Sequence, residues 1–378
     1  MSGIYIHIPF CKQACYYCDF HFSTSLKRKE EMLRAIRSEL LMRKEEVTDV
    51  VDTIYFGGGT PSLLTMNEIG EILDLIQNHF SLSDRPEITL EANPDDLDPS
   101  TIHELYQSPV NRLSIGVQSF FDEDLIFMNR AHNAIQSENS LKLASRYFDN
   151  ISIDLIYGVP GLSESRWLKN LHRAFDLGIA HISSYALTVE PKTALAHFIK
   201  SGKYPPLDES LARRHFEILQ REFLKKGYIQ YEISNFGLEG YFSKHNASYW
   251  KGASYIGIGP AAHSYDGACR SWNISNNAKY MASILKGQRP AESEMLSFED
   301  RIYEAIMTGL RTIWGVSLAN LANNYGGNYR LRILEQAKRH LDQDTLKLEN
   351  DHLYITEKGS FLADGIASDL FLLKLSFN

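Results

Sequence analysis

The stretch Tyr5-Ile-His-Ile-Pro-Phe-Cys-Lys-Gln-Ala-Cys-Tyr-Tyr-Cys-Asp-Phe20 is the most informative part of this chain. It begins as an apolar, strand-like segment and continues with Cys11, Cys15 and Cys18 at the spacing C-x3-C-x2-C. Three thiolates at this spacing can each bind one iron of a cubane iron–sulfur cluster, so that the fourth iron has no protein ligand. Such an iron can bind another molecule. The stretch therefore predicts a strand that ends in a cluster-binding loop.

Zinc is the alternative occupant of this loop. A structural zinc site takes four ligands, often from C-x2-C pairs, and His7 or His21 could supply the fourth. A disulfide framework is disfavoured, because three clustered cysteines and a distant Cys269 are too few to cross-link 378 residues. Cys269 is expected in a loop, without a ligand role.

The composition is that of a globular protein inside the cell. Of the 378 residues, 44% are hydrophobic and 23% charged, and no run approaches the length of a membrane-spanning helix. The chain enters its first strand at once, so we expect no signal peptide and a cytoplasmic location, where clusters can be assembled. The net charge of −8 argues against general nucleic-acid binding but leaves peripheral membrane contact open. The oligomeric state is also left open.

The first half of the chain alternates strand-like and helix-like segments. The expected strands are Tyr5–Ile8, Thr53–Phe56, Glu87–Glu91, Arg112–Gly116, Ile151–Ile156 and His181–Leu187. The expected helices between them are Arg28–Lys44, Met66–Phe80, Pro99–Tyr106, Ala134–Tyr147 and Ser163–Leu177. This alternation predicts an α/β fold with a parallel sheet and outer helices. Periodicity alone does not separate a barrel from a doubly wound sheet, but both bind ligands at the carboxyl ends of the strands.

The remaining sequence predicts a second, smaller domain. We expect a first domain over residues 1–275 and a C-terminal helical domain over residues 290–378. Leu346–Glu349 and Leu353–Thr356 alternate around Asn350-Asp351, which predicts a small hairpin. Helices with a hairpin resemble a winged helix. No basic face is concentrated here, so a packing or lid role is favoured over DNA binding.

Polar motifs follow the predicted strands at the edge where ligands bind. Gly57-Gly-Gly-Thr-Pro61 follows the second strand, and its bare amides could contact a ligand closely. Glu91 and Gln118 end the third and fourth strands, and Arg130 could pair with a carboxylate. Asp154 is a lone acid within an apolar strand, where an unpaired charge is unfavourable. A surface salt bridge is the alternative for Arg130, and a strand end or helix cap for Glu91.

The cysteine spacing resembles that of the radical S-adenosylmethionine (SAM) superfamily. Together with Gly57-Gly-Gly-Thr-Pro61, Gly116-Val-Gln-Ser-Phe120 and Asp154-Leu-Ile-Tyr-Gly-Val-Pro-Gly161, it is similar to the oxygen-independent coproporphyrinogen III oxidase family over about residues 1–270. The resemblance implies a partial (β/α)6 barrel, a [4Fe-4S] cluster and SAM bound to the open iron.

The resemblance also implies roles for individual residues, and it implies no catalytic side chain. Cys11, Cys15 and Cys18 would be the cluster ligands. The implied SAM-binding residues are Tyr5, Tyr17, Gly58, Gly59, Thr60, Glu91, Gln118, Arg130, Asp154 and Ala186, with Ile258 as an apolar contact. Tyr5 would lie near the sulfonium, Tyr17 on the nucleoside, and the backbone of Ala186 near the adenine. Either tyrosine could instead belong to the core.

Two departures separate this chain from the oxidase and match the haem chaperone branch of the family. The oxidase has a further cysteine where this chain has Phe20, and it has a longer segment before the cluster strand. Lys244-His-Asn-Ala-Ser-Tyr-Trp250 fits the H-N-x-x-Y-W motif of the chaperone branch. That resemblance implies His245 as a haem ligand in a pocket shaped by Asn246, Tyr249 and Trp250, with His263 as a weaker candidate. The motif could equally serve the fold.

The preferred hypothesis is therefore a haem chaperone that binds a [4Fe-4S] cluster, SAM and haem. It would transfer haem to acceptor haemoproteins, with respiratory enzymes at the inner face of the membrane as one class of acceptor. The alternatives are an oxygen-independent coproporphyrinogen III oxidase and a zinc-stabilised barrel without redox chemistry. The sequence does not identify the acceptor, the electron donor or the fate of SAM.

Overall fold

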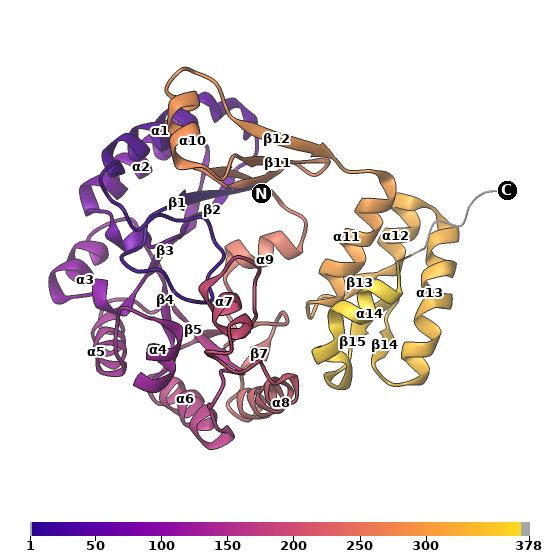
Figure 1. Cartoon of the computed structure of the whole chain (residues 1–378). Coiled ribbons are helices and arrows are strands. Elements are labelled where there is room, and N and C mark those ends of the chain that lie inside the picture. The colour runs from indigo at the N-terminus through magenta and orange to yellow at the C-terminus, as the bar shows by residue number, and fades with distance from the viewer. Residues whose placement is uncertain (1, 372–378) are drawn as a thin grey trace.

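The computed structural model describes residues 2–371, which form two lobes. In the larger lobe, strands form an incomplete ring with helices outside it, and the smaller lobe packs against one side (Figure 1). The N-terminus lies within the larger lobe and the described chain ends in the smaller one (Figure 1). Over the described residues, every helix is too short or too polar to cross a bilayer.

A mixed sheet of twelve strands, counted over residues 2–371, runs through the larger lobe in the order β12-β11-β10-β9-β1-β2-β3-β4-β5-β6-β8-β7. Strands β1 to β6 are parallel and adjacent in sequence order. Their bounds are β1 Ser2–Ile8, β2 Val51–Gly58, β3 Leu82–Ala92, β4 Arg112–Gln118, β5 Ile151–Tyr157 and β6 His181–Ala186. Their near-continuous apolar runs suit strands that are buried on both faces. The predicted partial (β/α)6 barrel is confirmed.

Helices cover the outside of these strands. They are α1 Lys29–Met42, α2 Met66–His79, α3 Pro99–Tyr106, α4 Asp122–Met128, α5 Ala134–Ala144 and α6 Glu164–Asp176, with short 3-10 turns η1 Lys44–Glu46, η2 Pro61–Leu63 and η3 Pro94–Asp96. Helix α2 begins at a capping box in which the Thr65 and Glu68 side chains each bond the other's backbone amide. Helix α4 was not predicted, because two turns are too few to show a helical period.

The chain after β6 extends the sheet at both ends. Its elements are α7 Ala194–Lys200, α8 Glu209–Lys225, β7 Ile229–Gln230, β8 Asn235–Gly237, α9 Lys244–Trp250, β9 Ser254–Ile258, β10 His263–Tyr265, β11 Cys269–Asn273, α10 Asn277–Ile284 and β12 Ala291–Met295. β9 pairs in parallel with β1, on the side away from β2. Helix α9 packs against β1 and β2. Cys269 begins β11, so its predicted loop location is wrong.

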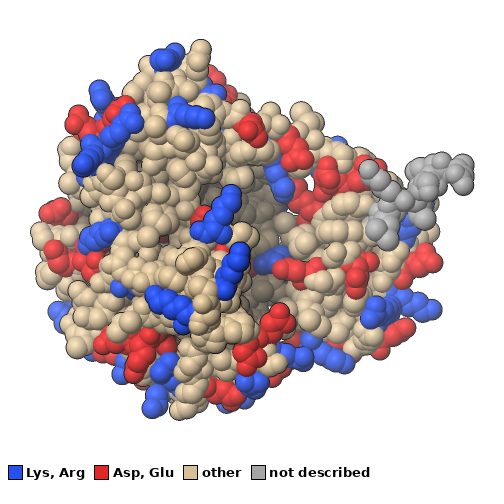
Figure 2. Space-filling model, viewed as in Figure 1, with Lys and Arg blue, Asp and Glu red and all other residues tan. Residues whose placement is uncertain are grey.

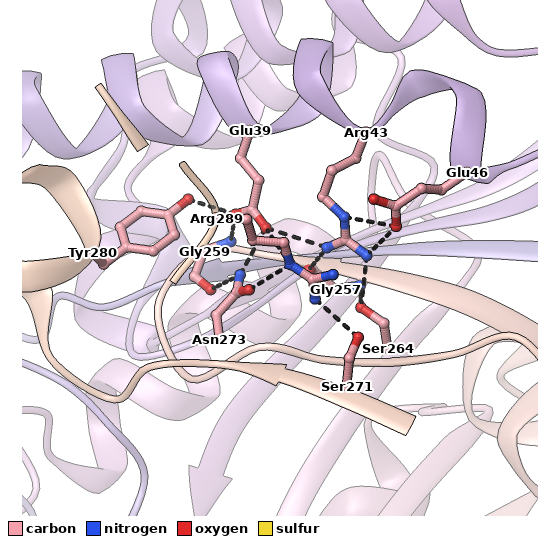
Figure 3. Close-up of polar contacts among 10 residues, drawn as sticks. All are labelled: Glu39, Arg43, Glu46, Gly257, Gly259, Ser264, Ser271, Asn273, Tyr280 and Arg289. Carbon is pink, nitrogen blue, oxygen red and sulfur yellow. Dashed lines mark hydrogen bonds and ion pairs between the residues drawn. The ribbon is translucent and has the colours of Figure 1, made fainter. Parts of the chain in front are cut away.

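A buried polar network joins α1 to this extension (Figure 3). Glu39 and Arg43 form an ion pair of 3.2 Å with side chains that are 0% and 1% exposed. Glu39 also accepts hydrogen bonds of 2.6–2.8 Å from the Gly259 amide, Tyr280 and Asn273. The Arg43 guanidinium donates to the Gly257 carbonyl and to Ser264. Because charges buried this deeply are tolerated only when paired, the network holds β9, β10, β11 and α10 against α1.

The smaller lobe contains a three-stranded sheet and helices. Its elements are α11 Phe298–Leu310, β13 Val316–Ser317, α12 Leu318–Tyr325, α13 Gly327–Asp342, β14 Leu346–Glu349, β15 His352–Ile355, η4 Glu357–Leu362 and α14 Ala363–Asp369. The sheet order is β13-β15-β14. Asn350 and Asp351 adopt φ of 49° and 60°, which allows the tight turn between β14 and β15. The predicted hairpin is confirmed.

Each lobe has a hydrophobic core of its own. The core of the larger lobe extends in sequence to Ile284, and that of the smaller lobe begins at Ile302. Strand β12 still belongs to the large sheet and ends at Met295. We therefore propose that the chain has two domains that divide between Met295 and Phe298.

Candidate functional site

The three clustered cysteines lie in the loop between β1 and α1, at the carboxyl end of β1. A backbone hydrogen bond of 3.1 Å from Cys11 to Ser23 closes this loop. All three thiols are partly exposed and free of disulfides. Burial raises the pKa of Cys11, and it raises that of Cys18 to about 12. The Cys11 and Cys18 thiols are therefore protonated at neutral pH unless a metal ion binds them, because coordination deprotonates a thiol.

A cavity of about 160 Å3 brings most of the predicted site residues together. The predicted residues that line it are Cys11, Cys15, Cys18, Tyr17, Gly58, Gly59, Thr60, Glu91, Gln118, Arg130 and Asp154. These residues come from the carboxyl ends of β1 to β5 and the loops that follow. Parallel α/β folds place their ligands at this edge. Phe20, which is 68% exposed, also lines the cavity.

The glycine loop has a different local role from the one predicted. The amides of Gly58, Gly59 and Thr60 are not bare, because they donate to the Glu91 carboxylate, the Ile8 carbonyl and the Phe10 carbonyl. A Cβ atom at Gly59 would lie 2.4 Å from the Phe10 carbonyl oxygen. Glycine is thus required because this loop packs directly against the start of the cysteine loop. The prediction that bare amides in this loop contact a ligand is therefore wrong for this conformation.

Glu91 and Asp154 are buried acids that face the same cavity. Tyr55 donates a hydrogen bond of 2.8 Å to Glu91, and the Gly58 amide donates another of 3.1 Å. Burial raises the pKa of Glu91 to about 7, and the nearby Asp154 adds to the effect. Burial likewise raises the pKa of Asp154 to about 6, although Ser183 opposes the shift. The cavity therefore favours a bound group that carries positive charge or hydrogen-bond donors.

Arg130 connects the cysteine loop to the third and fourth strands. Its Nη1 atom lies 3.3 Å from the Cys15 Sγ, and its Nη2 atom donates to Asn93 at 2.6 Å and to the Gly116 carbonyl at 2.9 Å. Its Nε atom is buried and has no hydrogen-bond partner within residues 2–371. A buried guanidinium donor without a partner fits a ligand with a carboxylate. Asn93 was not among the predicted site residues, although it lies two residues after Glu91.

Gln118 and Tyr17 complete the wall near Arg130. Gln118 ends β4 with φ of 65°, a left-handed conformation that is unfavourable for a residue other than glycine. Such local strain gathers at binding sites. The Tyr17 hydroxyl accepts a hydrogen bond of 3.4 Å from Arg130.

Tyr5 and Ala186 do not line this cavity. Tyr5 is stacked on Tyr55 with ring centroids 6.1 Å apart, and its hydroxyl is hydrogen-bonded to His7 at 3.2 Å. Ala186 ends β6 opposite Tyr157 in β5. Ile258 is fully buried in β9, which pairs with β1. In this conformation these three residues support the barrel around the cavity.

His245 is buried beneath the barrel strands, away from the cavity. Its Nδ1 atom is hydrogen-bonded to Thr53 at 2.7 Å and its Nε2 atom to Tyr249 at 2.7 Å. Burial lowers its pKa to about 3, so the ring is neutral. An imidazole with both nitrogens bonded cannot ligate haem iron without rearrangement, so the prediction of His245 as the axial ligand does not hold here. His263 is exposed on β10 and is stacked on Trp272.

The histidines considered as zinc ligands are also occupied. His7 Nε2 donates to the His21 carbonyl at 2.8 Å, and His21 Nε2 is bonded to Asn277 at 2.7 Å. Within the described residues, no three His, Cys, Asp or Glu side chains converge as a site for one metal ion. A cubane does not require the three ligands to converge on one ion, because each thiolate binds a separate iron. The donor set, three thiols without an imidazole, fits a cubane better than zinc.

Comparisons with known proteins identify the family. Residues 5–183 match the model of the radical SAM superfamily, and residues 296–362 match that of the HemN C-terminal domain. A Bacillus subtilis (strain 168) protein named "Heme chaperone HemW" is 33% identical over 374 residues, which cover 97% of this chain and 98% of the relative. This chain belongs to the HemW family of radical SAM proteins. The resemblance inferred from the cysteine, glycine and H-N-x-x-Y-W motifs is confirmed.

Two further matches cover nearly the whole chain. A "Heme chaperone HemW" of Lactococcus lactis subsp. lactis (strain IL1403) is 32% identical over 377 residues, covering 100% of this chain and 99% of the relative. The solved structure of coproporphyrinogen III oxidase (HemN) from Escherichia coli superimposes with a TM-score of 0.83, covering 98% of this chain and 90% of that one. At 21% identity, this likeness supports the fold alone.

Proposed function

We propose that this chain is a cytoplasmic haem chaperone, which binds a [4Fe-4S] cluster, SAM and haem and delivers haem to acceptor haemoproteins. The proposal rests on sequence identity of 32–33%, over nearly the whole chain, to proteins named "Heme chaperone HemW". Respiratory enzymes at the inner face of the membrane are one class of acceptor, which the chain would meet through peripheral contact.

The cavity supports the cofactor part of this proposal. Cys11, Cys15 and Cys18 would hold the cluster, which supplies single electrons when bound. Arg130 contacts the Cys15 side of the loop and lines the cavity, where its guanidinium would pair with a carboxylate such as that of SAM. Glu91 and Asp154 offer acceptors to the amino and hydroxyl groups of the same ligand, and Glu91 can hold or release a proton near pH 7.

Phe20 bears on whether the chain also decarboxylates coproporphyrinogen. A phenyl ring lines the cavity at the position where the oxidase, by resemblance, has a fourth cysteine. Phenylalanine cannot ligate metal or transfer a proton. We therefore expect no formation of protoporphyrinogen.

Anaerobic reconstitution with iron and sulfide, followed by a haem titration, tests the proposal. The loaded protein should bind about one haem per chain and transfer it to an apo-haemoprotein, while SAM breakdown is followed in parallel. The same protein is incubated with coproporphyrinogen III, and the products are separated by chromatography. Haem binding and transfer without protoporphyrinogen would support the chaperone. Turnover of coproporphyrinogen without haem binding would overturn it in favour of the oxidase.

A further inference from the structure

Gln118 lies at a strained turn, where β4 ends in the wall of the cavity around the cysteine loop. The Ser119 amide donates a hydrogen bond of 2.8 Å to the Val117 carbonyl, and Gln118 between them has φ of 65°. A bond across three residues around a positive φ defines a γ-turn of the rare, strained kind. The pairing of β4 with β5 is also irregular between Ile115 and Gln118. Such strain persists only where the surrounding structure enforces it.

Buried side chains of α4 and α6 hold the residues that follow the turn. Asn170 of α6 accepts a hydrogen bond of 2.7 Å from the Phe120 amide and donates one of 3.1 Å to the Ser119 hydroxyl. That hydroxyl donates to the Asp124 carboxylate of α4 at 2.7 Å. Asn170 and Ser119 are 0% exposed, and Asp124 is 1% exposed. Figure 2 shows a closed surface with acidic and basic side chains where Figure 1 places α4 and α6, so these contacts lie beneath it.

His132, in the loop between α4 and α5, holds the residue before the turn. Its Nε2 atom lies 3.0 Å from the Val117 carbonyl oxygen, which can only accept, so this nitrogen donates the hydrogen bond. Arg166 of α6 donates to Asp124 at 2.6 Å and keeps that carboxylate in place. We call Asn170, Asp124 and His132 the turn clamp. Its members act on both sides of the strained residue from separate parts of the chain.

The turn clamp determines where the Gln118 carboxamide lies. A Cβ atom at Gly116 would lie 3.0 Å from the Gln118 Nε2 atom and 3.1 Å from the Arg130 Nη2 atom. The two polar groups therefore come together beside Gly116, and both line the cavity. The three clamp residues themselves do not line it. They can thus affect a bound ligand only through the turn.

We propose that the turn clamp positions the SAM site: it enforces the strained conformation of Gln118, so that the carboxamide is held beside Arg130 to bond the polar groups of SAM. This inference rests on the proposed function and adds how its SAM site is kept ready for the ligand. Without the clamp, the backbone would relax to a negative φ and carry the Gln118 side chain away from Gly116. A group that is already in place before the ligand arrives reduces the ordering cost of binding.

A double-mutant cycle on SAM affinity tests whether the clamp acts through Gln118. The full-length protein is reconstituted anaerobically with iron and sulfide and titrated with SAM by calorimetry. Gln118→Ala and Asn170→Ala should each weaken SAM binding about threefold to tenfold, the usual effect of losing one hydrogen bond. The double variant should bind SAM no more weakly than Gln118→Ala, because a residue that acts only through Gln118 then has nothing to position. Additive losses would indicate a general structural role and overturn the proposal.

Asn273→Ala is the matched control for Asn170→Ala. Asn273 is also a buried asparagine, 1% exposed, and it bonds a carboxylate and a backbone carbonyl outside the cavity. Its loss should lower the melting temperature and leave SAM affinity unchanged. A loss of SAM affinity equal to that of Asn170→Ala would count against the clamp.

His132 tests the other side of the turn and carries the test alone should Asn170→Ala prevent folding. His132→Leu removes the donor to Val117 and should weaken SAM binding, whereas His132→Gln keeps an amide donor and should restore it. If neither Asn170→Ala nor His132→Leu weakens SAM binding, the clamp does not position Gln118. If the unaltered reconstituted protein binds no SAM, the cofactor part of the proposed function itself fails.

Discussion

Replacing Glu39 with alanine should destabilise the larger lobe more than any exposed charge change. The substitution leaves Arg43 with a buried guanidinium that has lost its buried carboxylate partner. It also removes the acceptor for Gly259, Tyr280 and Asn273. The strands β9 to β11 are held to α1 through these contacts (Figure 3), so their attachment should weaken first.

The magnitude follows from burial. An exposed ion pair contributes about 0–1 kcal/mol, whereas breaking a buried pair by removing one partner costs about 3–5 kcal/mol. With both side chains at most 1% exposed, Glu39 and Arg43 form a buried pair. Arg43 keeps two hydrogen bonds of 2.7–2.9 Å to Glu46, so we expect the lower end of this range, about 3 kcal/mol. The three lost hydrogen bonds are included in this value, because contributions within one network are not additive. Against a typical total stability of about 5–15 kcal/mol, the variant should fold but unfold at clearly lower denaturant concentration.

Urea unfolding followed by far-UV circular dichroism measures the effect. Glu217→Ala is the matched control, because Glu217 forms an i,i+4 pair with Arg213 on α8 but both side chains are more than half exposed. The control should change the free energy of unfolding by less than about 0.5 kcal/mol. A double-mutant cycle with Arg43→Ala should give a coupling of about 2 kcal/mol or more. A loss below about 1 kcal/mol for Glu39→Ala, or a purely additive cycle, would refute the reasoning.

Three other substitutions test the site. Glu91→Gln should remove one contribution to the pH dependence of stability. Burial raises the pKa of Glu91 from 4.5 to about 7, so its contribution to the unfolding free energy of the cofactor-free chain is fully present below pH 4.5 and falls by up to about 3 kcal/mol as pH rises to 7. Urea titrations at several pH values measure the difference between the two proteins, and an equal slope in the variant would exclude Glu91. Gly59→Ala should abolish cluster absorbance while the circular dichroism stays unchanged, because the new methyl group meets the Phe10 carbonyl, whereas Gly70→Ala on α2 has open space and should retain the cluster. His245→Ala should lower the free energy of unfolding by about 2–4 kcal/mol, since two buried hydrogen bonds are lost, and an unchanged melting temperature would contradict this structural role.

Local pattern was sufficient for much of the fold. The strands β1 to β6 differ from the predicted ranges mainly at their ends, because buried parallel strands leave apolar runs that can be recognised without neighbours. The short helices α4, α9 and α10 were missed, since seven or eight residues do not establish a helical period. The pairing of β9 with β1 was also missed, because it joins residues about 250 positions apart.

The residues of the candidate site were likewise predicted where they form a local sequence pattern, and their orientation was not predicted where it depends on distant residues. Cysteine spacing and polar residues at strand ends are local features, and they led to Cys11, Cys15 and Cys18 and to most of the residues that line the cavity around them. The orientation of a side chain depends on partners elsewhere in the chain. His245 shows this. Its hydrogen bond to Thr53, 192 positions away, occupies a ring nitrogen that was expected to bind haem iron.

By itself, the sequence determined that three thiols lie in one short loop after a buried strand, because spacing and hydropathy are properties of consecutive residues. Only the tertiary structure decided that the amides of the glycine loop are bonded to neighbouring carbonyl and carboxylate groups, and that both ring nitrogens of His245 are hydrogen-bonded. Those relations depend on which distant surfaces meet when the chain folds. The periodicity of the sequence does not predict contacts between such distant segments.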